Sequence, residues 1–375
     1  MNPVKATDVH RQSIYRQEAH HASFALIPAS GKLKIMPATS AIDMTSDLTD
    51  ALRGLALAEP GETPRYSPLA GGVSSDIWRV DLRRGPVCMK RALPKLRVAR
   101  DWFAPVERWQ YEYAWFAAVA RIAPHAVPQL LGKDPKRQLF VMEFLDPGSH
   151  LLWKAELHHG VADPKFSASV GRLLAMIHAA TAGRPDIADQ FPTDAIFGAI
   201  RLEPYLAETA RAHPDLASQL NRLVEVTAAN KRALVHGDIS PKNILVGPQG
   251  PVFLDAECAW YGDPAFDLAF CLNHLMLKCL WVPEAAPGFL SCFDALSEAY
   301  LAGANWEPRR EFEMRAAALL PGLFLARIDG KSPVEYVVDE DDKNRVRRVG
   351  RALIAAPMEK LRSIRDVWAR ELKIV

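Results

Sequence analysis

Four polar residues near the middle of the chain have side chains that bind metal ions or accept protons. Asp238 and Asn243 lie before a pair of short apolar runs, and Asp255 and Glu257 lie directly after it. Carboxylate and amide oxygens are the hard ligands that Mg²⁺ prefers in proteins. An ionised aspartate also accepts a proton from a hydroxyl group within hydrogen-bonding reach. The four residues therefore indicate a candidate site for both kinds of chemistry.

The apolar runs between these residues predict a β-hairpin that brings the polar groups together. The runs Ile244–Val246 and Val252–Leu254 flank a Gly-Pro-Gln-Gly-Pro segment, and glycine and proline in such a position indicate a tight turn. Because a hairpin brings its two ends together, we expect the polar residues before and after it to converge on one point. The five-residue spacing from Asp238 to Asn243 is also that of a kinase catalytic loop.

In its wider context this stretch resembles the aminoglycoside phosphotransferase superfamily, which includes choline, fructosamine and methylthioribose kinases. The residues that carry the resemblance are His236-Gly237-Asp238 with Asn243, Asp255 with Glu257, and Tyr261-Gly262-Asp263-Pro264 with Asp267. A solvated acidic loop between two strands is the alternative, but such a loop rarely carries both the metal-type residues and the downstream Gly-Asp-Pro-x-x-Asp segment. The resemblance implies an α+β, bilobal, protein-kinase-like fold with a small β-rich N-lobe and a larger, mostly helical C-lobe.

Length and composition fit a globular protein of two domains. The chain has 375 residues, of which 49% are hydrophobic and 24% charged, and a chain of this length usually splits into domains. Its net charge of +2 gives no argument for nucleic acid or an anionic membrane as a partner, and no apolar run reaches the length of a membrane span. The N-terminus lacks the apolar block of a signal peptide, and the five cysteines form no C-x-x-C pair. We therefore expect a cytoplasmic protein with reduced cysteines and no nucleic-acid or membrane partner.

We expect three parts along the chain: a leader at residues 1–58, an N-lobe at 59–146 and a C-lobe at 147–375. The leader shows little periodicity apart from a modest helical pattern after Met44. Residues 1–43 are interpreted either as a flexible leader or as the product of a mis-assigned start, and both alternatives stay open.

The start of the N-lobe has the features of a loop that holds phosphate groups. Asp76–Leu82 alternates apolar and polar residues as a half-buried strand does, and Pro86–Lys90 follows as a second strand. Two glycines ahead of the first strand allow backbone N–H groups to approach a phosphate closely, although most Gly-Gly-x-Ser-Ser segments are plain turns. In the superfamily this loop precedes a strand that bears a lysine, which here would be Lys90. The resemblance therefore assigns the phosphate contacts to the backbone amides of Gly71, Gly72, Ser74 and Ser75.

Lys90 is expected to form an ion pair with Glu112. The helix predicted around Glu112 carries aromatic residues at Trp109 and Phe116, and Glu112 shares their inward face because it lies three residues after one and four before the other. A carboxylate on an aromatic face needs a cationic partner, and the lysine–glutamate pair of kinases indicates Lys90. Glu107 is the second choice, and a Glu112 side chain that reaches solvent from the helix edge is the remaining alternative.

A hinge between the lobes is predicted where the apolar run Leu139–Leu145 meets an Asp-Pro-Gly turn. A strand that ends in a turn between two lobes fits the segment that pairs with adenine through backbone groups. The resemblance includes the Met142-Glu143 pair and assigns adenine binding to Glu143 and Leu145. Because any core strand that ends in a turn has the same pattern, this assignment depends on the order of the segments in the chain.

The resemblance implies transfer of a phosphoryl group from ATP with the help of Mg²⁺. Lys90 would contact the phosphates, and Asn243 and Asp255 would hold Mg²⁺, with Glu257 as a further metal carboxylate. Asp238 would accept the proton of the substrate hydroxyl. The two remaining motif residues would brace the catalytic loop without reacting, and these are His236 and Asp267.

The substrate is expected to be a small molecule with a hydroxyl group: a sugar, an amino alcohol or an aminoglycoside. Twelve positions separate Asp255 from Asp267, whereas a protein kinase needs a longer activation segment with an Ala-Pro-Glu motif. The segment Arg201–Tyr205 resembles methylthioribose kinases. The acidic run Asp339–Asp342 either attracts an amine or is a solvated loop. Several basic residues either bind an anion or lie on the surface, namely Arg327, Lys331, Arg345, Arg347 and Arg348.

The remainder of the chain is predicted to be mostly helical. Helices are expected at residues 106–119, 170–178, 214–223, 268–281, 288–302, 310–327 and 343–371. A catalytically weak or inactive nucleotide-binding scaffold of the same fold is the alternative function. Such a scaffold normally lacks the lysine or one of the two aspartates, whereas Lys90, Asp238 and Asp255 are all present.

Overall fold

The computed structural model describes three ranges of the chain, residues 38–69, 74–94 and 105–374. The chain divides into two compact units, residues 1–48 and 49–375, and the boundary falls inside helix α2 (Ala38–Gly54). The helical pattern predicted near the end of the leader is therefore confirmed. Gly71 and Gly72 lie outside the described residues, so their contact with phosphate stays a prediction.

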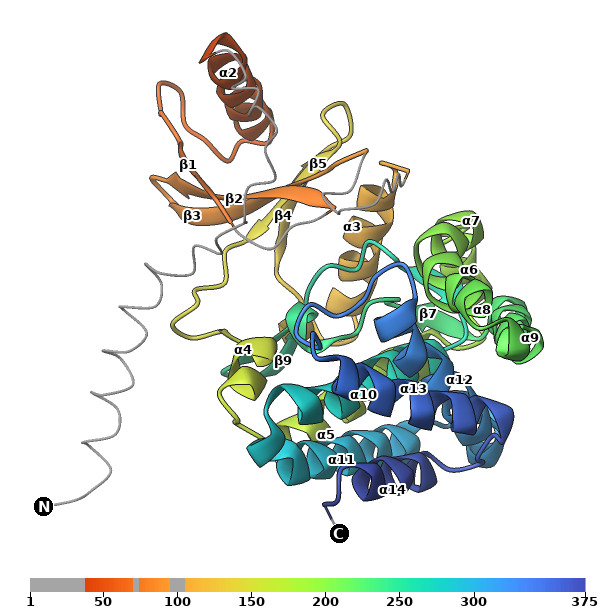
Figure 1. Ribbon diagram of the computed structural model, residues 1–375. Coiled ribbons are helices and arrows are strands. Elements are labelled where there is room, and N and C mark those ends of the chain that lie inside the picture. Colours follow the sequence, from red (N-terminus) through yellow and green to blue (C-terminus); the bar gives the residue numbers. More distant parts are fainter. Residues whose placement is uncertain (1–37, 70–73, 95–104, 375) are drawn as a thin grey trace, which may run out of the picture. The chain divides into compact units, whose positions relative to one another are not determined.

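An antiparallel sheet follows α2 in the second unit (Figure 1), with its strands in the order β1-β2-β3-β5-β4. Along β2, Trp78, Val80 and Leu82 are buried and the residues between them are partly exposed. This alternation is the period of two expected for a strand with one face against the core. The two strands predicted in this region are confirmed. The bounds are β1 (Arg65–Pro68), β2 (Ser75–Leu82), β3 (Gly85–Ala92), β4 (Leu130–Asp134) and β5 (Leu139–Glu143).

Helix α3 (Arg108–Ala120) packs against this sheet through aromatic residues. The rings of Tyr113 and Phe116 meet the ring of Phe140 on β5 edge to face, with centroids 5.9 Å and 6.2 Å apart. Glu112 lies in this packed region and is only 1% exposed. The predicted helix is confirmed, and it buries a carboxylate beside the sheet.

The predicted hairpin is present and closes as the turn residues indicated. Strand β8 (Ile244–Gly247) pairs in antiparallel register with β9 (Gly250–Phe253). The backbone N–H of Leu254 donates to the carbonyl of Asn243 at 2.9 Å, which holds the residues before and after the hairpin together. The other strands are β6 (Leu151–Leu152), which joins β8, and β7 (Ala233–Val235), which pairs with β10 (Trp260–Gly262).

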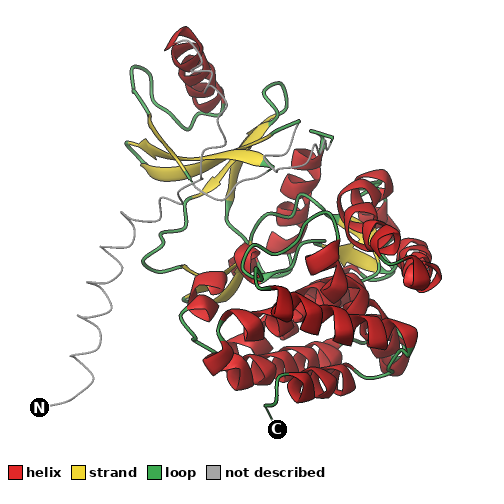
Figure 2. Cartoon of the chain, viewed as in Figure 1, coloured by secondary structure: helices red, strands yellow, loops and turns green. Residues whose placement is uncertain are grey.

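The rest of the second unit is mostly helical (Figure 2), so the predicted α+β class is confirmed. The helices are α4 (Trp153–His158), α5 (Pro164–Thr181), α6 (Pro185–Ala188), α7 (Asp194–Phe197), α8 (Glu208–Ala212), α9 (Ala217–Ala229), α10 (Ala265–Trp281), α11 (Ala286–Gly303), α12 (Arg309–Asp329), α13 (Glu340–Ala355) and α14 (Leu361–Glu371). Helices α5 and α11 approach closely at Gly171, where a Cβ atom would lie 2.3 Å from the carbonyl oxygen of Leu296. No helix in the described ranges is long and apolar enough to cross a membrane.

The single helix expected at residues 343–371 is two helices, because α13 ends at Ala355 and α14 begins at Leu361. Between them, Ala356 has φ −131° and ψ 81°, and the next residue is Pro357. A proline ring disfavours helical geometry in the residue that precedes it. The prediction of one continuous helix is wrong because it did not account for this effect.

A π-helical segment, η2 (Gly198–Ala207), lies between α7 and α8 and was not predicted from any apolar pattern. It contains Pro204, which has no N–H group to donate in a regular helix. Its Arg201 is only 6% exposed, although arginine is rarely buried without a partner. Widened turns of this kind occur often at functional sites, and Arg201 reaches the loop after β7, where it donates to the carbonyl of Gly237.

Candidate active site

The loop between β7 and β8 places Asp238 and Asn243 against each other. Asn243 Nδ2 donates to Asp238 Oδ2 at 2.9 Å and to the backbone carbonyl of Asp238 at 3.0 Å. Asp238 is 3% exposed, and its other carboxylate oxygen, Oδ1, is buried without a hydrogen-bond partner in the described part of the chain. Because an unpaired buried oxygen is costly, this atom is suited to accept a hydrogen bond from a ligand.

Two basic residues that were not predicted to have a catalytic role form ion pairs with Asp238. Arg201 Nη2 and Lys242 Nζ each lie 3.0 Å from Asp238 Oδ2. Burial acts to raise the pKa of Asp238, but Arg201 and then Lys242 outweigh it, so the pKa is lowered. Asp238 is therefore ionised at neutral pH and able to accept a proton. The position of Lys242, four residues after Asp238, was a signal in the sequence, whereas no spacing indicated Arg201.

Asp267, at the start of α10, holds the backbone of the catalytic loop. Its two carboxylate oxygens accept hydrogen bonds from the N–H groups of His236 and Gly237, both at 2.8 Å. Gly237 has φ +79°, and a Cβ atom there would lie 2.6 Å from the carbonyl oxygen of Cys258, so this position requires glycine. His178 Nε2 lies 3.2 Å from Asp267 on its other side. These contacts are those of a residue that braces the loop.

His236 is fully buried and links the two halves of the site. Its Nδ1 accepts from the backbone N–H of Asp238 at 3.1 Å, so the ring proton lies on Nε2, which donates to the carbonyl of Leu254 at 3.0 Å. Burial lowers the pKa of His236 by more than the nearby carboxylates raise it. The ring is therefore neutral, and it connects the loop that bears Asp238 to the strand end that precedes Asp255.

Lys90 on β3 lies between two carboxylates, Glu112 and Asp255. Its Nζ is 2.7 Å from Glu112 Oε1 and 2.5 Å from Asp255 Oδ1. The predicted ion pair with Glu112 is present, whereas Glu107 is exposed. Burial acts to lower the pKa of Lys90, but Asp255 and then Glu112 raise it above its ordinary value. Lys90 therefore carries a permanent positive charge in the site.

Asp255 has an unusual backbone conformation directly after β9. Its φ of +64° lies in the left-handed region that residues other than glycine rarely occupy, and such strain is typical of functional sites. Burial acts to raise the pKa of Asp255, but Lys90 and then Lys242 outweigh it, so the carboxylate is ionised. The side chain is 27% exposed, so a ligand can reach it.

Asp255 and Asn243 fit a Mg²⁺ site of the kind that phosphate oxygens complete. Magnesium bound together with phosphates usually takes one or two carboxylates from the protein and not a complete cage. Within the described ranges, no group of three His, Cys, Asp or Glu side chains is arranged as a protein-only metal site. Asp255 supplies an ionised carboxylate, and the bond from Leu254 N–H to the backbone carbonyl of Asn243 holds the Asn243 backbone beside the residue that precedes Asp255.

Glu257 has a different partner in this structure. Its Oε2 accepts from Arg108 Nε at 2.9 Å, and both residues are buried. Arg108 Nη2 also donates to the carbonyls of Ser74 and Leu93, at 2.5 Å and 2.7 Å. Arg108, which the sequence did not single out, therefore ties Glu257 to the start of β2. A direct contact between Glu257 and a metal ion stays a prediction.

The described residues of the expected nucleotide site lie at the ends of sheet strands. Ser74 and Ser75 lead into β2 and are 3% and 2% exposed. Glu143 ends β5, where its N–H donates to the carbonyl of Gln129 at 2.8 Å, and Leu145 follows as a half-buried residue. Binding of phosphate and adenine at these positions stays a prediction.

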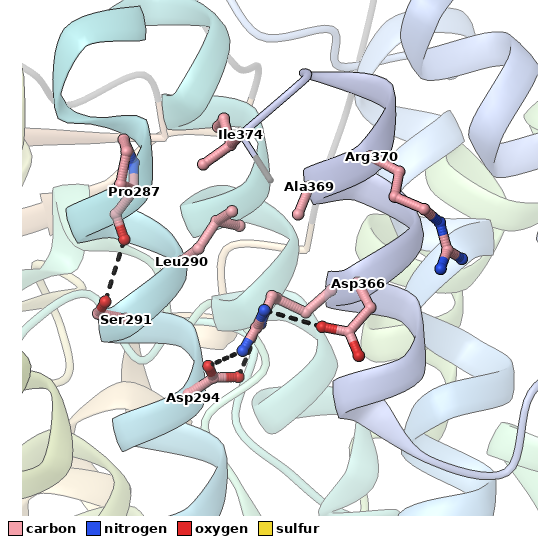
Figure 3. Close-up of a pocket in the computed structure, with 9 residues that line it drawn as sticks. Pro287, Leu290, Ser291, Asp294, Asp366, Ala369, Arg370 and Ile374 are labelled. Atoms are coloured by element: carbon pink, nitrogen blue, oxygen red, sulfur yellow. Dashed lines mark hydrogen bonds and ion pairs between the residues drawn. The ribbon is translucent and has the colours of Figure 1, made fainter.

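A separate hollow lies between α11 and α14 (Figure 3), lined in part by Leu290 and Ala369. Arg365 forms ion pairs there with Asp294, at 3.1 Å from Nε, and with Asp366, at 2.8 Å from Nη1. These three charged residues pair with one another. The lining of the hollow shares no residue with the site around Asp238.

The arrangement of an antiparallel sheet and a mostly helical remainder is also found in a solved structure. An amicoumacin kinase, hAmiN, solved in complex with AMP-PNP, Ca²⁺ and Ami, superposes with a TM-score of 0.50 at 14% identity. The superposition covers 88% of this chain and 99% of that one. The chain therefore has the bilobal, protein-kinase-like fold that the sequence predicted.

Residues 65–312 match the family model described as the phosphotransferase enzyme family. Since these residues make up more than half of the chain, the protein belongs to that family, and the resemblance drawn from its motifs is confirmed.

Two curated relatives are methylthioribose kinases. The enzyme of Escherichia coli O45:K1 (strain S88 / ExPEC) is 28% identical over 255 residues, which are 58% of this chain and 59% of the relative. The enzyme of Erwinia tasmaniensis (strain DSM 17950 / CFBP 7177 / CIP 109463 / NCPPB 4357 / Et1/99) is 27% identical over 235 residues, which are 54% and 56% of the two chains. The chain thus matches less than two thirds of the length of these relatives.

Proposed function

We propose that this protein is an ATP-dependent small-molecule kinase that transfers the γ-phosphoryl group to a hydroxyl group with the help of Mg²⁺. The observation that carries the proposal is the convergence of four side chains, those of Lys90, Asp238, Asn243 and Asp255. They come from the sheet, the catalytic loop and the end of the hairpin. This set matches the needs of phosphoryl transfer, which are positioning and neutralisation of charge.

Each side chain has a distinct role in this proposal. Lys90, oriented by Glu112, binds phosphate oxygens of ATP. Asn243 and Asp255 would hold Mg²⁺, which when bound neutralises charge on the phosphates. Asp238 accepts the proton of the acceptor hydroxyl through Oδ1, while the hydroxyl oxygen bonds to the γ-phosphorus. The bond from that phosphorus to the β–γ bridging oxygen breaks, and ADP leaves.

We further propose the division of labour along the chain that its order indicates. Residues 59–146 would bind the nucleotide. The backbone amides of residues 71–75 would contact its phosphates, and Glu143 and Leu145 would contact adenine. Residues 147–375 would supply the catalytic loop, the metal ligands and the acceptor site. The ion pair between Lys90 and Asp255 supports this division, because it joins β3 of the sheet to the end of the hairpin.

A cytoplasmic location is proposed from the chemistry of the cysteines. Cys88, Cys258, Cys271, Cys279 and Cys292 are all free and buried. Structural disulfides are common in oxidising compartments and rare in the cytosol. Free thiols buried in the core therefore support a reducing environment.

The proposed acceptor is a sugar, an amino alcohol or an aminoglycoside. Of these three classes, the methylthioribose kinase relatives support a sugar. A catalytically inactive nucleotide-binding scaffold is the competing function. An active kinase is favoured over such a scaffold because Lys90, Asp238 and Asp255 are all present and contact their partners.

The test is release of ADP by the full-length protein with Mg²⁺-ATP and an acceptor panel that includes methylthioribose. Asp238→Asn should lower turnover by about 10²–10⁴-fold, as removal of a general base does, and should leave the affinity for ATP nearly unchanged. Asp189→Asn, which changes an exposed aspartate at the end of α6, is the matched control. Tight binding of Mg²⁺-ATP without ADP release for any acceptor would favour the scaffold, and absence of ATP binding would refute both functions.

A further inference from the structure

The inward face of α10 continues from the catalytic loop into a second set of polar residues. Asp267 braces the loop, and His274 and Lys278 follow seven and eleven residues later, which is close to two and three helical turns. The three residues therefore share one face, and Lys278 lies about 16 Å along the helix from Asp267. His274 is 6% exposed and Lys278 is 1% exposed. Buried basic residues on this face need an explanation.

Lys278 is a buried amine without a carboxylate partner. Its Nζ lies 3.8 Å from the ring centroid of Trp281 and 3.7 Å from that of Tyr336. It forms no ion pair with any carboxylate of the described residues. The aromatic faces attract a cation, but they compensate only a part of the cost of removing an ammonium group from water.

Arg327 on α12 is a second buried basic residue, and it lies close enough to Lys278 to lower the pKa of that amine. It is 8% exposed, and its Nη1 donates to the hydroxyl groups of Tyr205 and Ser332, at 3.2 Å and 3.1 Å. These partners are neutral. Its Nε is buried without a hydrogen-bond partner in the described part of the chain. A guanidinium group held in this way has a free donor and an uncompensated charge.

Two further polar atoms beside these cations are also unpaired. His274 Nε2 and the hydroxyl oxygen of Tyr336 are buried, and neither has a hydrogen-bond partner within the ranges that the structure describes. Arg327 and Lys278 lie close enough to His274 to lower its pKa, after the larger effect of burial. Unpaired buried polar groups are rare in folded proteins, so their occurrence together at one place indicates a site for a ligand.

This set of residues, which we call the basic cluster (His274, Lys278, Arg327 and Tyr336), adjoins the catalytic aspartate. Tyr205 makes the connection. The guanidinium carbon of Arg201, the partner of Asp238, lies 5.7 Å from the ring centroid of Tyr205, and that of Arg327 lies 5.6 Å from the same centroid. Lys242, the other partner of Asp238, also acts on the pKa of His274. The basic cluster is therefore placed where the far end of an acceptor would lie.

The carboxylates near the basic cluster are already paired. Asp238 forms ion pairs with Arg201 and Lys242, and Glu335 forms one with Lys154. Arg327 therefore has a positive charge without a counter-charge beside the acceptor site, and Lys278 is a buried amine that an anion would cause to take up a proton. A buried charge without a counter-charge is strongly unfavourable, and a bound anion would supply the missing negative charge.

We propose that the acceptor is a hydroxyl compound that also carries an anionic group, a carboxylate or a phosphate, and that Lys278 and Arg327 bind this group while the hydroxyl group faces Asp238. The proposal rests on the kinase function proposed above and narrows its acceptor to one chemical class. Charge-assisted hydrogen bonds from Arg327 Nε and Lys278 Nζ would bind the anion, and His274 and Tyr336 would supply further polar contacts.

The same geometry disfavours cationic acceptors such as amino alcohols and aminoglycosides. A like charge placed beside Lys278 and Arg327 is repelled. The acidic run Asp339–Asp342, which could have attracted an amine, has a structural role instead. Asp339 Oδ1 accepts hydrogen bonds from the N–H groups of Asp341 and Asp342 and caps α13. Acidic residues at a helix N-terminus also stabilise the helix through their interaction with its dipole.

The test compares glucose, gluconate, glucose 6-phosphate, methylthioribose and choline with the full-length protein and Mg²⁺-ATP. Turnover is followed by ADP release, and binding of each compound is followed by calorimetry with the non-hydrolysable analogue AMP-PNP and Mg²⁺. Gluconate and glucose 6-phosphate distinguish a carboxylate from a phosphate. We expect at least one of these two anions to bind saturably and to be preferred over glucose by tenfold or more.

Variants of the basic cluster assign the effect to its residues. Lys278→Met and Arg327→Met each replace a basic side chain with an unbranched apolar one. Each variant should bind the preferred anion about tenfold or more weakly, and the KM for ATP should stay unchanged. Lys278→Arg should restore part of the affinity. Lys231→Met is the matched control, because Lys231 also lies over a tryptophan ring, that of Trp260 at 4.1 Å, but has Asp194 as its ion-pair partner.

The outcomes separate the two proposals. Equal or better use of glucose, methylthioribose or choline would overturn the anionic acceptor, and so would absence of saturable binding by both anions or unchanged anion affinity in Lys278→Met and Arg327→Met. Failure of Mg²⁺-AMP-PNP to bind would refute the kinase function instead, and anion calorimetry on the protein alone would still decide the role of the basic cluster. Circular dichroism and melting temperature establish that each variant is folded.

Discussion

Arg201 lies 3.0 Å from Asp238 through Nη2 and donates from Nε to the carbonyl of Gly237 at 2.5 Å. Two contacts from one planar guanidinium group hold the carboxylate in a defined orientation relative to the loop backbone. Because Oδ2 of Asp238 is occupied by Arg201, Lys242 and Asn243, Oδ1 is left for the proton of the acceptor. In the proposed reaction, Arg201 would therefore position Asp238 as the general base.

Arg201→Gln should lower kcat by about 10- to 100-fold, because a small displacement of a reacting group has this effect, and should change the KM for ATP little. Arg201→Lys keeps the charge without the two-contact geometry, so its kcat should be intermediate. Arg211→Gln is the control, since Arg211 is exposed and pairs with Glu203 and Glu208. Steady-state kinetics checks the prediction, and an unchanged kcat in Arg201→Gln would contradict the positioning role.

Lys90→Ala and Glu112→Gln should be non-additive in kcat/KM. Each residue needs the other, because Glu112 orients the amine and Lys90 neutralises a carboxylate that is 1% exposed. The double variant should therefore be little worse than Lys90→Ala alone. A double-mutant cycle measures the coupling. Glu107→Gln, at the exposed residue that precedes α3, should show no coupling with Lys90→Ala, and additive effects for Glu112 would mean that the ion pair is not used in catalysis.

Mg²⁺-ATP should raise the melting temperature of the protein. A ligand that binds only the folded state at a hundredfold excess over Kd adds about 2.7 kcal/mol, which should raise the melting temperature of a chain of this size by at least a few degrees. Asp255→Ala should remove most of the Mg²⁺-dependent part of the shift, because it removes the ionised carboxylate proposed as a metal ligand. Asp189→Ala should keep the whole shift, and a shift that ignores Mg²⁺ and survives Asp255→Ala would argue against the assigned metal site.

Lys278 should make the stability of the protein depend on pH. Burial and then Lys154 lower the pKa of Lys278 to about 6, while Glu335 opposes them. An unfolded lysine has a pKa of about 10.4, so between about pH 6 and pH 10 the unfolded chain binds a proton that the folded chain does not. In this window the free energy of unfolding therefore increases as the pH rises from about 6 to about 10. The charged and titratable groups around the amine are Lys154 of α4, His274 of α10, Arg327 of α12, Glu335 and Tyr336.

Lys278→Met should therefore have a higher melting temperature than the wild type near pH 6–7, and the difference should shrink toward pH 10. Thermal denaturation over this range measures it, with Lys231→Met as the control that shows no such trend. A bound anion would favour the protonated amine, so acceptor binding should take up a proton above pH 6. Calorimetry in two buffers of different ionisation enthalpy measures this uptake, and equal binding enthalpies in the two buffers would contradict it.

The sequence by itself determined the parts of this protein that depend on local structure. The hairpin of β8 and β9 followed from a turn of glycine and proline between two apolar runs, and it brings Asn243 to the end of the strand that precedes Asp255. The inward position of Glu112 followed from its spacing to two aromatic residues of α3. Such patterns are visible in sequence because the period of a strand or helix decides which side chains share a face.

Only the tertiary structure decided which charges are paired and which are left unpaired. Arg201 reaches Asp238 from a π-helical segment that no residue spacing places beside the loop, and Arg108 meets Glu257 across 149 residues of chain. Lys278 looks like an ordinary basic residue of an apolar helix until the fold buries it beside Arg327. The energy of a charge depends on burial and on neighbours brought from other elements, and neither quantity is encoded in local spacing.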